Sequence, residues 1–381
     1  MKIVQAQIYP LSIPLIDPIK MSGETINEAK TVVLRLIDDS GFIGWGEASV
    51  APLMTGETLD SLLGNLRYLL LRVRDLDWKN PCEFNELFNR VLYGNSSVKS
   101  CLQMALLDLH TKHKEIPLWK YLRELFDKPS LENPPMLPIL RMIGGSPEKE
   151  LADAAILRKE GYRHWKIKVG LLPIESDIDR VEALCSVLQG DVVSVDANGA
   201  MNLDNAVRFC TSDKTKLLAF AEQLISAKSS VCEFRELKKQ SKIPIGLDES
   251  IHGVNEIERF IELKSFDGAS LKLIKTGGLI ESMECAQLLE KNGLKVNLAC
   301  KVAETSISAA ATAALGFAMG NIPWGFSMSN QYLRFDVCEQ PLKANQGFLN
   351  IEQLIPLGIG IAPEDEILGA SLVKGYSIIS C

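Results

Sequence analysis

The alternation of apolar and polar residues changes character twice along the chain. Residues 1–11, 31–37 and 42–47 alternate with a period of two, which predicts β-strands, and the turn at 38–41 predicts a hairpin between the last two. From about residue 59 to residue 126 the apolar residues recur at helical spacing instead. The first third of the chain is therefore predicted to be an α+β unit.

The helical part carries two apolar stripes, each on one face of a predicted helix. They consist of Leu62, Leu63, Leu66, Leu69 and Leu70, and of Cys101, Met104, Ala105, Leu106 and Leu109. Residues 20–27, within a polar stretch, and residues 50–58 contain glycine and apolar tips and are predicted to be loops. Such loops are either surface turns or flaps that close over a ligand.

After a proline-rich linker at 133–138, short apolar strands alternate regularly with amphipathic helices. The predicted strands are 137–143, 164–169, 192–196, 218–222, 243–248, 268–273, 294–299 and 322–328. Helical segments such as 149–160, 176–189 and 279–292 separate them. Seven or eight strand–helix units are typical of a parallel barrel. A doubly wound open sheet is the alternative, but no Gly-x-Gly-x-x-Gly follows a first strand.

The chain, at 381 residues, is long enough for a complete barrel and a second unit. We expect a capping domain at residues 1–132 and a barrel domain at 133–344. The strand-like tail, from about 345 to 381, is predicted to return to the capping domain. The predicted fold class is thus α/β, a (β/α)7β-type TIM barrel with an α+β N-terminal capping domain.

Composition narrows the choice of partners and compartment. The net charge of −7 and the absence of a basic stripe argue against nucleic acid. No window approaches 18 uninterrupted apolar residues, and the N-terminus alternates like a strand, so neither a membrane span nor a signal peptide is predicted. The nine cysteines include no Cys-x-x-Cys pair, which favours reduced thiols in a cytoplasmic protein.

Candidate chemistry begins in the predicted strand His164-Trp165-Lys166-Ile167-Lys168-Val169. Lys166 and Lys168 are two residues apart, so they point the same way. Mutual repulsion and partial burial are both expected to lower a lysine pKa toward the range in which the amine accepts a proton. An isolated pair of this kind would instead be a solvated strand face.

Three later strands each end in a carboxylate: Asp196, Glu222 and Asp248. The acids are evenly spaced, one strand–helix unit apart, at the strand ends where barrel enzymes place their chemistry. Three such carboxylates would surround a hard cation, and Mg²⁺ suits them best, with Mn²⁺ as an alternative ion. The other interpretation is that each acid caps the helix after its strand.

Lys272 lies in the apolar run 268–273, where an unpaired charge is costly. In a barrel its strand is nearly opposite the strand of Lys168, so the two amines would flank the α-carbon of a bound carboxylate. Either amine could remove or return the α-proton, while Lys166 and the metal would stabilise an enediolate. Lys275 is predicted to lie in the following loop.

The order Lys-x-Lys, Asp, Glu, Asp and then Lys followed by Gly-Gly resembles the enolase superfamily, in its muconate-lactonizing subgroup, over essentially the whole chain. Enolase-superfamily sites with a Lys or His base and Mg²⁺ are themselves a standard example of this chemistry. The resemblance implies Mg²⁺ ligands at Asp196, Glu222 and Asp248, an acid/base pair at Lys168 and Lys272, and an electrostatic role for Lys166. It also implies that Asn198 and Glu249 orient these groups, that the loops at 20–27 and 50–58 read the substrate, and that the chain forms a homo-oligomer. The mandelate racemase subgroup fits worse, because no histidine falls on the seventh strand.

Some residues depart from the better-known members. Ser327 and Ser329 stand where dipeptide epimerases carry an Asp-x-Asp pair for the substrate ammonium, and a neutral pair would hold a cation less well. Gln223 is followed by leucine where relatives usually have proline. Glu304, after the seventh strand, would either orient substrate or begin the next helix.

We therefore expect a Mg²⁺-dependent isomerase that acts on a small carboxylate, with a racemase or epimerase of an amino acid derivative or dipeptide as the leading hypothesis. A cycloisomerase or dehydratase would use the same site with one lysine as the base. Two alternatives are not enzymes. One is a barrel that binds a metal or ligand without catalysis, and the other is a structural interaction protein with these charges in surface ion pairs.

Overall fold

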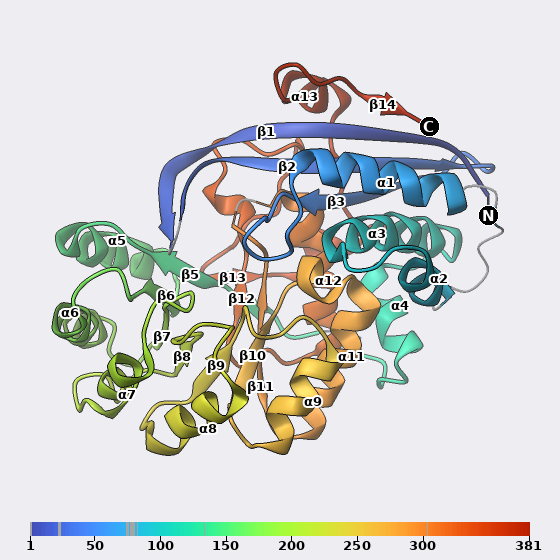
Figure 1. The fold of residues 1–381 in the computed structure, drawn as a ribbon. Coiled ribbons are helices and arrows are strands. Elements are labelled where there is room, and N and C mark those ends of the chain that lie inside the picture. The colour runs from blue at the N-terminus through green and yellow to red at the C-terminus, as the bar shows by residue number, and fades with distance from the viewer. Residues whose placement is uncertain are drawn as a thin grey trace.

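A computed structural model describes residues 2–21, 24–73, 76, 81, 83–132, 134–302 and 304–381. Two β-sheets dominate it: an antiparallel sheet near the N-terminus and a parallel sheet of eight strands. Figure 1 shows the antiparallel sheet, with its helices, lying across one end of the parallel one. The candidate catalytic and metal-binding residues lie at the strand ends of the second sheet.

The parallel sheet is a barrel whose strands follow one another in chain order. They are β5 (Leu140–Ile143), β6 (His164–Lys168), β7 (Val192–Asp196), β8 (Phe220–Glu222), β9 (Ile245–Leu247), β10 (Gly268–Leu271), β11 (Lys295–Ala299) and β12 (Phe326–Ser327). A parallel bridge between Ile139 and Phe326 brings the two edge strands together. The predicted (β/α)7β-type barrel is confirmed, and each predicted strand overlaps an observed one.

Helices cover the outside of the barrel (Figure 1). They are α5 (Pro147–Lys159), α6 (Ile174–Val187), α7 (Leu203–Thr211), α8 (Val231–Gln240), α9 (Val254–Glu262), α10 (Leu273–Thr276), α11 (Leu279–Lys291) and α12 (Ser306–Met319). Several begin at a side chain that accepts a backbone N–H of the first turn, as Ser146, Asn202, Ser230 and Thr305 do. Side-chain capping therefore fixes the start of these four helices.

The antiparallel sheet has the strand order β14-β1-β2-β3. Its strands are β1 (Ile3–Met21), β2 (Glu24–Asp38), β3 (Ile43–Ser49) and β14 (Ile379–Ser380), and the helices beside it are α1 (Leu59–Val73), α2 (Glu83–Val91), α3 (Ser96–His113) and α4 (Leu118–Leu125). The short elements β4 (Leu137–Pro138), β13 (Phe348–Leu349), η1 (Asn330–Tyr332), η2 (Ile351–Leu354) and α13 (Asp365–Ala370) complete the described structure.

The predicted loop at 20–27 is wrong for the residues that the structure describes. β1 and β2 pair as far as Met21 and Glu24, and the loop positions 22 and 23 lie outside the described residues. This stretch forms strands because ladder hydrogen bonds join β1 to β2 and because Ile26 is buried and Ile19 packs against the core. The loop predicted at 50–58 is a loop in the structure.

The tail contacts both sheets. β13 pairs with β4 beside the barrel, and β14 pairs with β1 of the antiparallel sheet. The proposed domain limits at 132/133 and 344/345 stay predictions, and Asn133 itself lies outside the described residues.

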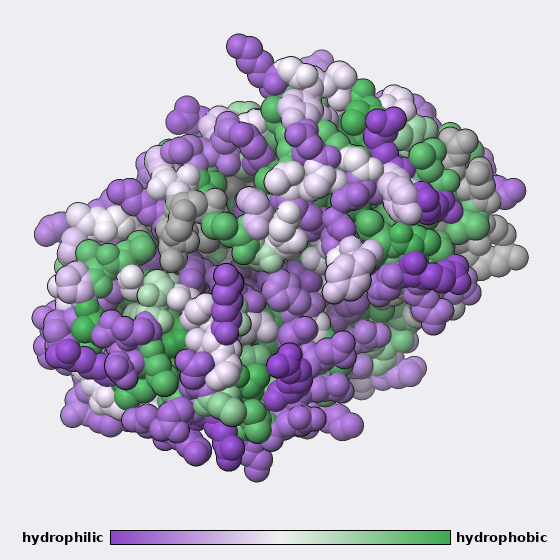
Figure 2. Space-filling model, viewed as in Figure 1, coloured by the Kyte–Doolittle hydropathy of each residue, from purple (hydrophilic) through white to green (hydrophobic). Residues whose placement is uncertain are grey.

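Other sequence expectations concern the surface and the thiols. Polar residues cover most of the face shown in Figure 2. Within the described part of the chain, no helix is both long and apolar enough to span a membrane. Each described cysteine is a free thiol, and most are buried.

Helix α3 is buried on nearly every face, whereas the sequence predicted a single apolar stripe. It lies between β3 and the barrel helices α10 and α11. Gly44 and Gly46 of β3 let the sheet rest directly on it, since a Cβ at Gly46 would lie 2.0 Å from the carbonyl oxygen of Cys101. The glycines in this strand are therefore a packing requirement.

Gly46→Ala is expected to lower the free energy of unfolding by roughly 1–3 kcal/mol, because the backbone of β3 or α3 must move to admit the methyl group. Chemical denaturation of both proteins measures this difference. Gly64→Ala is the matched control, since Gly64 is an exposed helical residue of α1 with nothing within 4 Å of the added Cβ. That change should be neutral or stabilise by about 0.5–1 kcal/mol. Equal effects of the two substitutions would contradict the packing argument.

Candidate active site

The carboxyl ends of neighbouring barrel strands hold the charged residues that the sequence singled out. Lys168 of β6 is in register with Asp196 of β7, and Asp196 with Glu222 of β8. Asp248 follows the last residue of β9, and Lys272 follows the last residue of β10. These side chains therefore meet at one end of the barrel, because parallel strands end at the same edge of a sheet.

Each of the predicted lysines forms an ion pair with one of the predicted acids. The nitrogen–oxygen distance is 2.5 Å for Lys166–Glu222, 2.6 Å for Lys168–Asp196 and 2.5 Å for Lys272–Asp248. Both partners of each pair are largely or fully removed from solvent. Lys166 and Lys168 reach separate acids from one strand face, as the period of two requires.

Lys275 is the residue of this cluster that sequence analysis placed elsewhere. It lies in the helical turn α10, not in a loop, and its fully buried ammonium is 2.5 Å from the second oxygen of Asp248. Lys272 likewise follows β10 as the N-cap of α10, although the sequence predicted a position within the strand. The available signal was the three-residue spacing of the two lysines, which places them on one face of a helical turn.

The acids reverse the expected effect on two of these lysine pKa values. Burial alone would lower the pKa of Lys166, but the charges of Glu222 and Asp196 outweigh it and the pKa is raised. The pKa of Lys272 is raised in the same way, chiefly by Asp248 against the effect of burial. The pKa of Lys275 is lowered, mainly by burial. Attraction to the acids, and not repulsion between Lys166 and Lys168, therefore decides the direction in which the pKa values of Lys166 and Lys272 are shifted.

The donor chemistry of the three acids suits a hard divalent cation. Both carboxylate oxygens of Glu222 are buried; Oε2 lies 2.5 Å from the Lys166 ammonium, and Oε1 has no hydrogen-bond partner. The pKa of Glu222 is raised by burial and by the nearby charges of Asp196 and Asp248. Three carboxylates that repel one another are a set that Mg²⁺ would stabilise. Among the described residues, no group of three or more histidine, cysteine, aspartate or glutamate side chains is positioned to hold a metal ion, and lysines engage all three acids.

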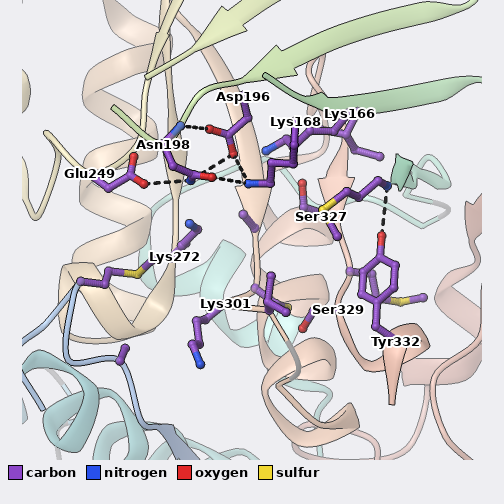
Figure 3. Close-up of a pocket in the computed structure, with 18 of the residues that line it drawn as sticks. Lys166, Lys168, Asp196, Asn198, Glu249, Lys272, Lys301, Ser327, Ser329 and Tyr332 are labelled. Carbon is purple, nitrogen blue, oxygen red and sulfur yellow. Dashed lines mark hydrogen bonds and ion pairs between the residues drawn. The ribbon is translucent and has the colours of Figure 1, made fainter. Parts of the chain in front are cut away.

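A cavity opens over these strand ends (Figure 3). The described residues that line it are Ala51, Leu53, Met54, Leu140, Met142, Lys166, Lys168, Asp196, Asn198, Glu249, Lys272, Ala299, Cys300, Lys301, Val302, Ser327, Met328, Ser329 and Tyr332. The loop after β3 contributes the first three, so the N-terminal part of the chain covers the strand ends. Ser327 and Ser329 also line the cavity, as does Lys301, which sequence analysis did not assign to the site.

Asn198 links the predicted groups at one end of the cavity. Its side chain accepts a hydrogen bond from Lys168 (2.7 Å) and donates to Asp196 (3.3 Å) and to Glu249 (2.9 Å), as Figure 3 shows. Burial and the charges of Asp248 and Asp196 raise the pKa of Glu249 to about 7. The Asn198 side chain therefore joins Lys168, Asp196 and Glu249 in one hydrogen-bonded group.

Glu304 lies behind the cavity wall and is not among the described lining residues. Its carboxylate accepts hydrogen bonds from Ser49 of the N-terminal sheet (3.1 Å) and from the backbone N–H of Lys301 (3.0 Å). Helix α12 begins two residues later. Burial, followed by the charge of Glu47, raises the pKa of Glu304 to about 8.

Glu47 is a second residue that the sequence did not single out. It is fully buried on β3, and it accepts hydrogen bonds from the Thr305 hydroxyl (2.8 Å) and from the backbone N–H groups of Thr305 and Ser308 (both 3.0 Å). The Glu47 carboxylate, on the N-terminal sheet, therefore caps the start of α12. No local sequence pattern predicts this contact.

A parallel barrel with paired lysines and acids at its strand ends, under an antiparallel cap, is an enzyme architecture. Residues 3–122 match the family model "Mandelate racemase / muconate lactonizing enzyme, N-terminal domain", and residues 149–367 match "Enolase C-terminal domain-like". The chain belongs to the mandelate racemase/muconate lactonizing enzyme family of the enolase superfamily.

Relatives within this family carry out different reactions. The chain is 30% identical over 365 residues to o-succinylbenzoate synthase of Bacillus subtilis (strain 168), covering 94% of each protein. It is 27% identical to a D-Ala-D/L-Ala epimerase of Cytophaga hutchinsonii, covering 78% of this chain and 79% of that one. It is thus an enolase-superfamily enzyme whose relatives include a synthase and an epimerase.

Solved structures agree with the fold. The N-succinyl Arg/Lys racemase from Bacillus cereus ATCC 14579 has a TM-score of 0.89 at 21% identity, with 100% of both chains covered. The dipeptide epimerase from Cytophaga hutchinsonii, complexed with Mg and the dipeptide D-Ala-L-Val, also has a TM-score of 0.89, at 23% identity and 100% coverage of both chains. The predicted resemblance and fold are therefore confirmed.

The raised pKa of Glu304 predicts how stability depends on pH. The ordinary value is 4.5 and the folded value about 8, so between them the folded state holds more protons. The free energy of unfolding therefore falls as pH rises through this range, by at most about 1.4 kcal/mol per pH unit. Glu304→Gln should flatten that decline in denaturation curves recorded from pH 4.5 to pH 8. Glu262→Gln, at an exposed position of α9, is the control and should leave the slope unchanged.

Proposed function

We propose that this enzyme is a Mg²⁺-dependent isomerase that removes the α-proton of a small carboxylate substrate to form an enediolate. A racemase or epimerase of an amino acid derivative or dipeptide fits best. The observation that carries the proposal is that Lys168, at the end of β6, and Lys272, directly after β10, line one cavity, and that β6 and β10 lie four strands apart in the barrel. Two amines that reach one carbon from two sides suit removal and return of a proton.

Lys168 and Lys272 would share the proton transfer. With the α-carbon of the substrate between the two amines, one lysine accepts the proton on one face and the other donates a proton on the opposite face. Lys166 is nearly buried beside them and carries a positive charge that stabilises the developing enediolate. Asn198 positions Lys168 through its 2.7 Å hydrogen bond.

Asp196, Glu222 and Asp248 would hold the metal ion. When bound, Mg²⁺ (or Mn²⁺) offsets the negative charge of the substrate carboxylate and lowers the cost of ionising the adjacent carbon. Glu249 lies close enough to Asp196 and Asp248 for their charges to raise its pKa, which suits a group that orients the ligands. Ser327 and Ser329 are proposed to contact the part of the substrate that does not react.

A second reaction uses the same residues. If one lysine acts as the base and the other only stabilises charge, the enzyme would be a cycloisomerase or a dehydratase acting by β-elimination. The 30% identity to o-succinylbenzoate synthase favours keeping this candidate. A non-catalytic binding barrel is the rival of another class, and it predicts no exchange of substrate protons.

Deuterium exchange at the α-carbon tests the reaction class. In D₂O with Mg²⁺, the wild-type protein should exchange the α-proton of at least one member of a panel of N-acyl amino acids, dipeptides and other carboxylates. Lys168→Ala and Lys272→Ala should each lower turnover by roughly 10²–10⁴-fold if both lysines transfer protons. A lyase or cycloisomerase should tolerate one of the two changes. Lys291→Ala, at an exposed position of α11, is the control. Exchange that survives both site substitutions would refute the proposal.

Thermal unfolding tests the metal ligands without any substrate. After treatment with EDTA, added Mg²⁺ should stabilise the wild-type protein by roughly 2–3 kcal/mol at about one hundred times the dissociation constant. This increment should vanish in Asp196→Asn/Glu222→Gln, whatever the stability of the metal-free variant. Asp204→Asn, at an exposed position of α7, should keep it. The same Mg²⁺ increment in the double variant would remove these acids from the metal site.

A further inference from the structure

We infer that Arg180 is a positioning residue for Lys168, and that Glu150 and Asp177 hold its guanidinium group in place. None of these three side chains is among the described residues that line the cavity. The inference rests on the proposed function, because it concerns the lysine on one face of the substrate. It predicts that proton removal from the two enantiomers of a substrate depends on Arg180 to different degrees.

The backbone around Lys168 lies at the point where β6 leaves the sheet. Pairing with β5 ends at Ile167, so no residue of β5 lies opposite Lys168. The N–H of Val169 still donates to the carbonyl oxygen of Asp196 at 2.9 Å, whereas Gly170, with a φ of +87°, turns the chain out of the strand. The carbonyl oxygen of Lys168 and the N–H of Gly170 therefore need partners from outside the sheet.

Arg180 and Asp177 of α6 supply both partners. A terminal nitrogen of Arg180, Nη2, donates to the carbonyl oxygen of Lys168 at 2.5 Å, and Oδ2 of Asp177 accepts from the Gly170 N–H at 2.6 Å. The same Arg180 nitrogen donates to Oδ1 of Asp177 at 2.8 Å. One group of hydrogen bonds therefore connects helix α6 to the backbone on both sides of Val169.

Glu150 of α5 holds the guanidinium group through its other terminal nitrogen. Oε1 of Glu150 accepts from Nη1 of Arg180 at 2.6 Å, and Figure 1 shows α5 and α6 side by side on the outside of the barrel. The side chains of Glu150 and Asp177 are 1% and 0% exposed, and that of Arg180 is 10% exposed. A buried guanidinium group that donates to three acceptors has little freedom to rotate or shift.

The position of the Lys168 amine depends on this backbone. The Lys168 side chain reaches into the cavity, where its nitrogen lies 2.6 Å from Asp196 and 2.7 Å from Asn198 (Figure 3). Loss of Arg180 would leave the Lys168 carbonyl without its partner from α6 and would leave two buried acids without their cation, so the backbone is expected to move. A misplacement of about 1 Å at a reacting group can slow a reaction by roughly 100-fold.

Lys272, the lysine proposed on the opposite face of the substrate, is held by different groups. Its amine lies 2.5 Å from Asp248, and its backbone begins α10 directly after β10. β10 lies four strands from β6 in the barrel. A change at Arg180 should therefore disturb proton transfer on the face of Lys168 and leave the face of Lys272 nearly intact.

Deuterium exchange measured separately for the two enantiomers of an exchanged carboxylate tests the inference. Lys168→Ala first identifies the enantiomer whose α-proton Lys168 removes. In Arg180→Met, exchange of that enantiomer should fall by roughly 10- to 100-fold, chiefly in kcat, while exchange of the other enantiomer stays nearly unchanged. Arg259→Met, at an exposed position of α9, is the control and should affect neither enantiomer. Equal losses for the two enantiomers, as a general loss of structure would give, or no loss for either, would overturn the inference.

Crystal structures of the wild-type protein and the variant give a readout that needs no turnover. In Arg180→Met the Lys168 amine should leave Asp196 and Asn198, while Lys272 keeps its ion pair; a Lys168 amine in its original place would overturn the inference. Should Arg180→Met fail to fold, Arg180→Lys replaces it in both experiments, because one ammonium nitrogen cannot take the places of two guanidinium nitrogens. If no carboxylate exchanges deuterium, or if no exchange depends on Lys168, the proposed function fails, and the crystal structures still decide the role of Arg180.

Discussion

Buried charge has to be matched, and the carboxyl ends of the barrel strands are built around this constraint. Asp196, Glu222 and Asp248 lie within reach of lysines from β6 and α10, and every one of these acids is engaged by an ammonium group. A single unpaired member would leave a charge in a poorly solvated place, at a cost of several kcal/mol. The acids and lysines of the site therefore form one electrostatic unit.

A second set of buried acids, Glu47 and Glu304, forms hydrogen bonds between the N-terminal antiparallel sheet and the same end of the barrel. Glu47 of β3 accepts backbone hydrogen bonds from the first turn of α12, and Ser49 donates to Glu304. Helix α12 follows the turn that carries Lys301, and the loop after β3 carries Leu53 and Met54 into the cavity. These hydrogen bonds therefore connect the loop after β3 to the turn after β11 through Glu47, Ser49 and Glu304, which are not among the described residues that line the cavity.

Sequence patterns predicted what depends on local periodicity. The strand period aligned Lys166 with Lys168, and regular strand–helix units placed Asp196, Glu222 and Asp248 at successive strand ends. The patterns failed where a contact between distant segments decides the structure. Residues 19–21 and 24–26 are held by pairing between β1 and β2, and Lys275 is buried in a helix of four residues, which is too short to show a period. Glu47 caps a helix more than 250 residues away, which no local window can register.

This division between local and distant contacts also explains why chemistry is easier to infer than substrate. The proposed proton transfer would use residues at the strand ends of one continuous sheet, where topology fixes their order. The loop after β3, the turn after β11 and the segment after β12 line the same cavity, and substrate recognition is proposed to use these segments. Enzymes with a TM-score of 0.89 to this chain share the sheet at only 21% or 23% identity, so their substrates do not transfer with the fold.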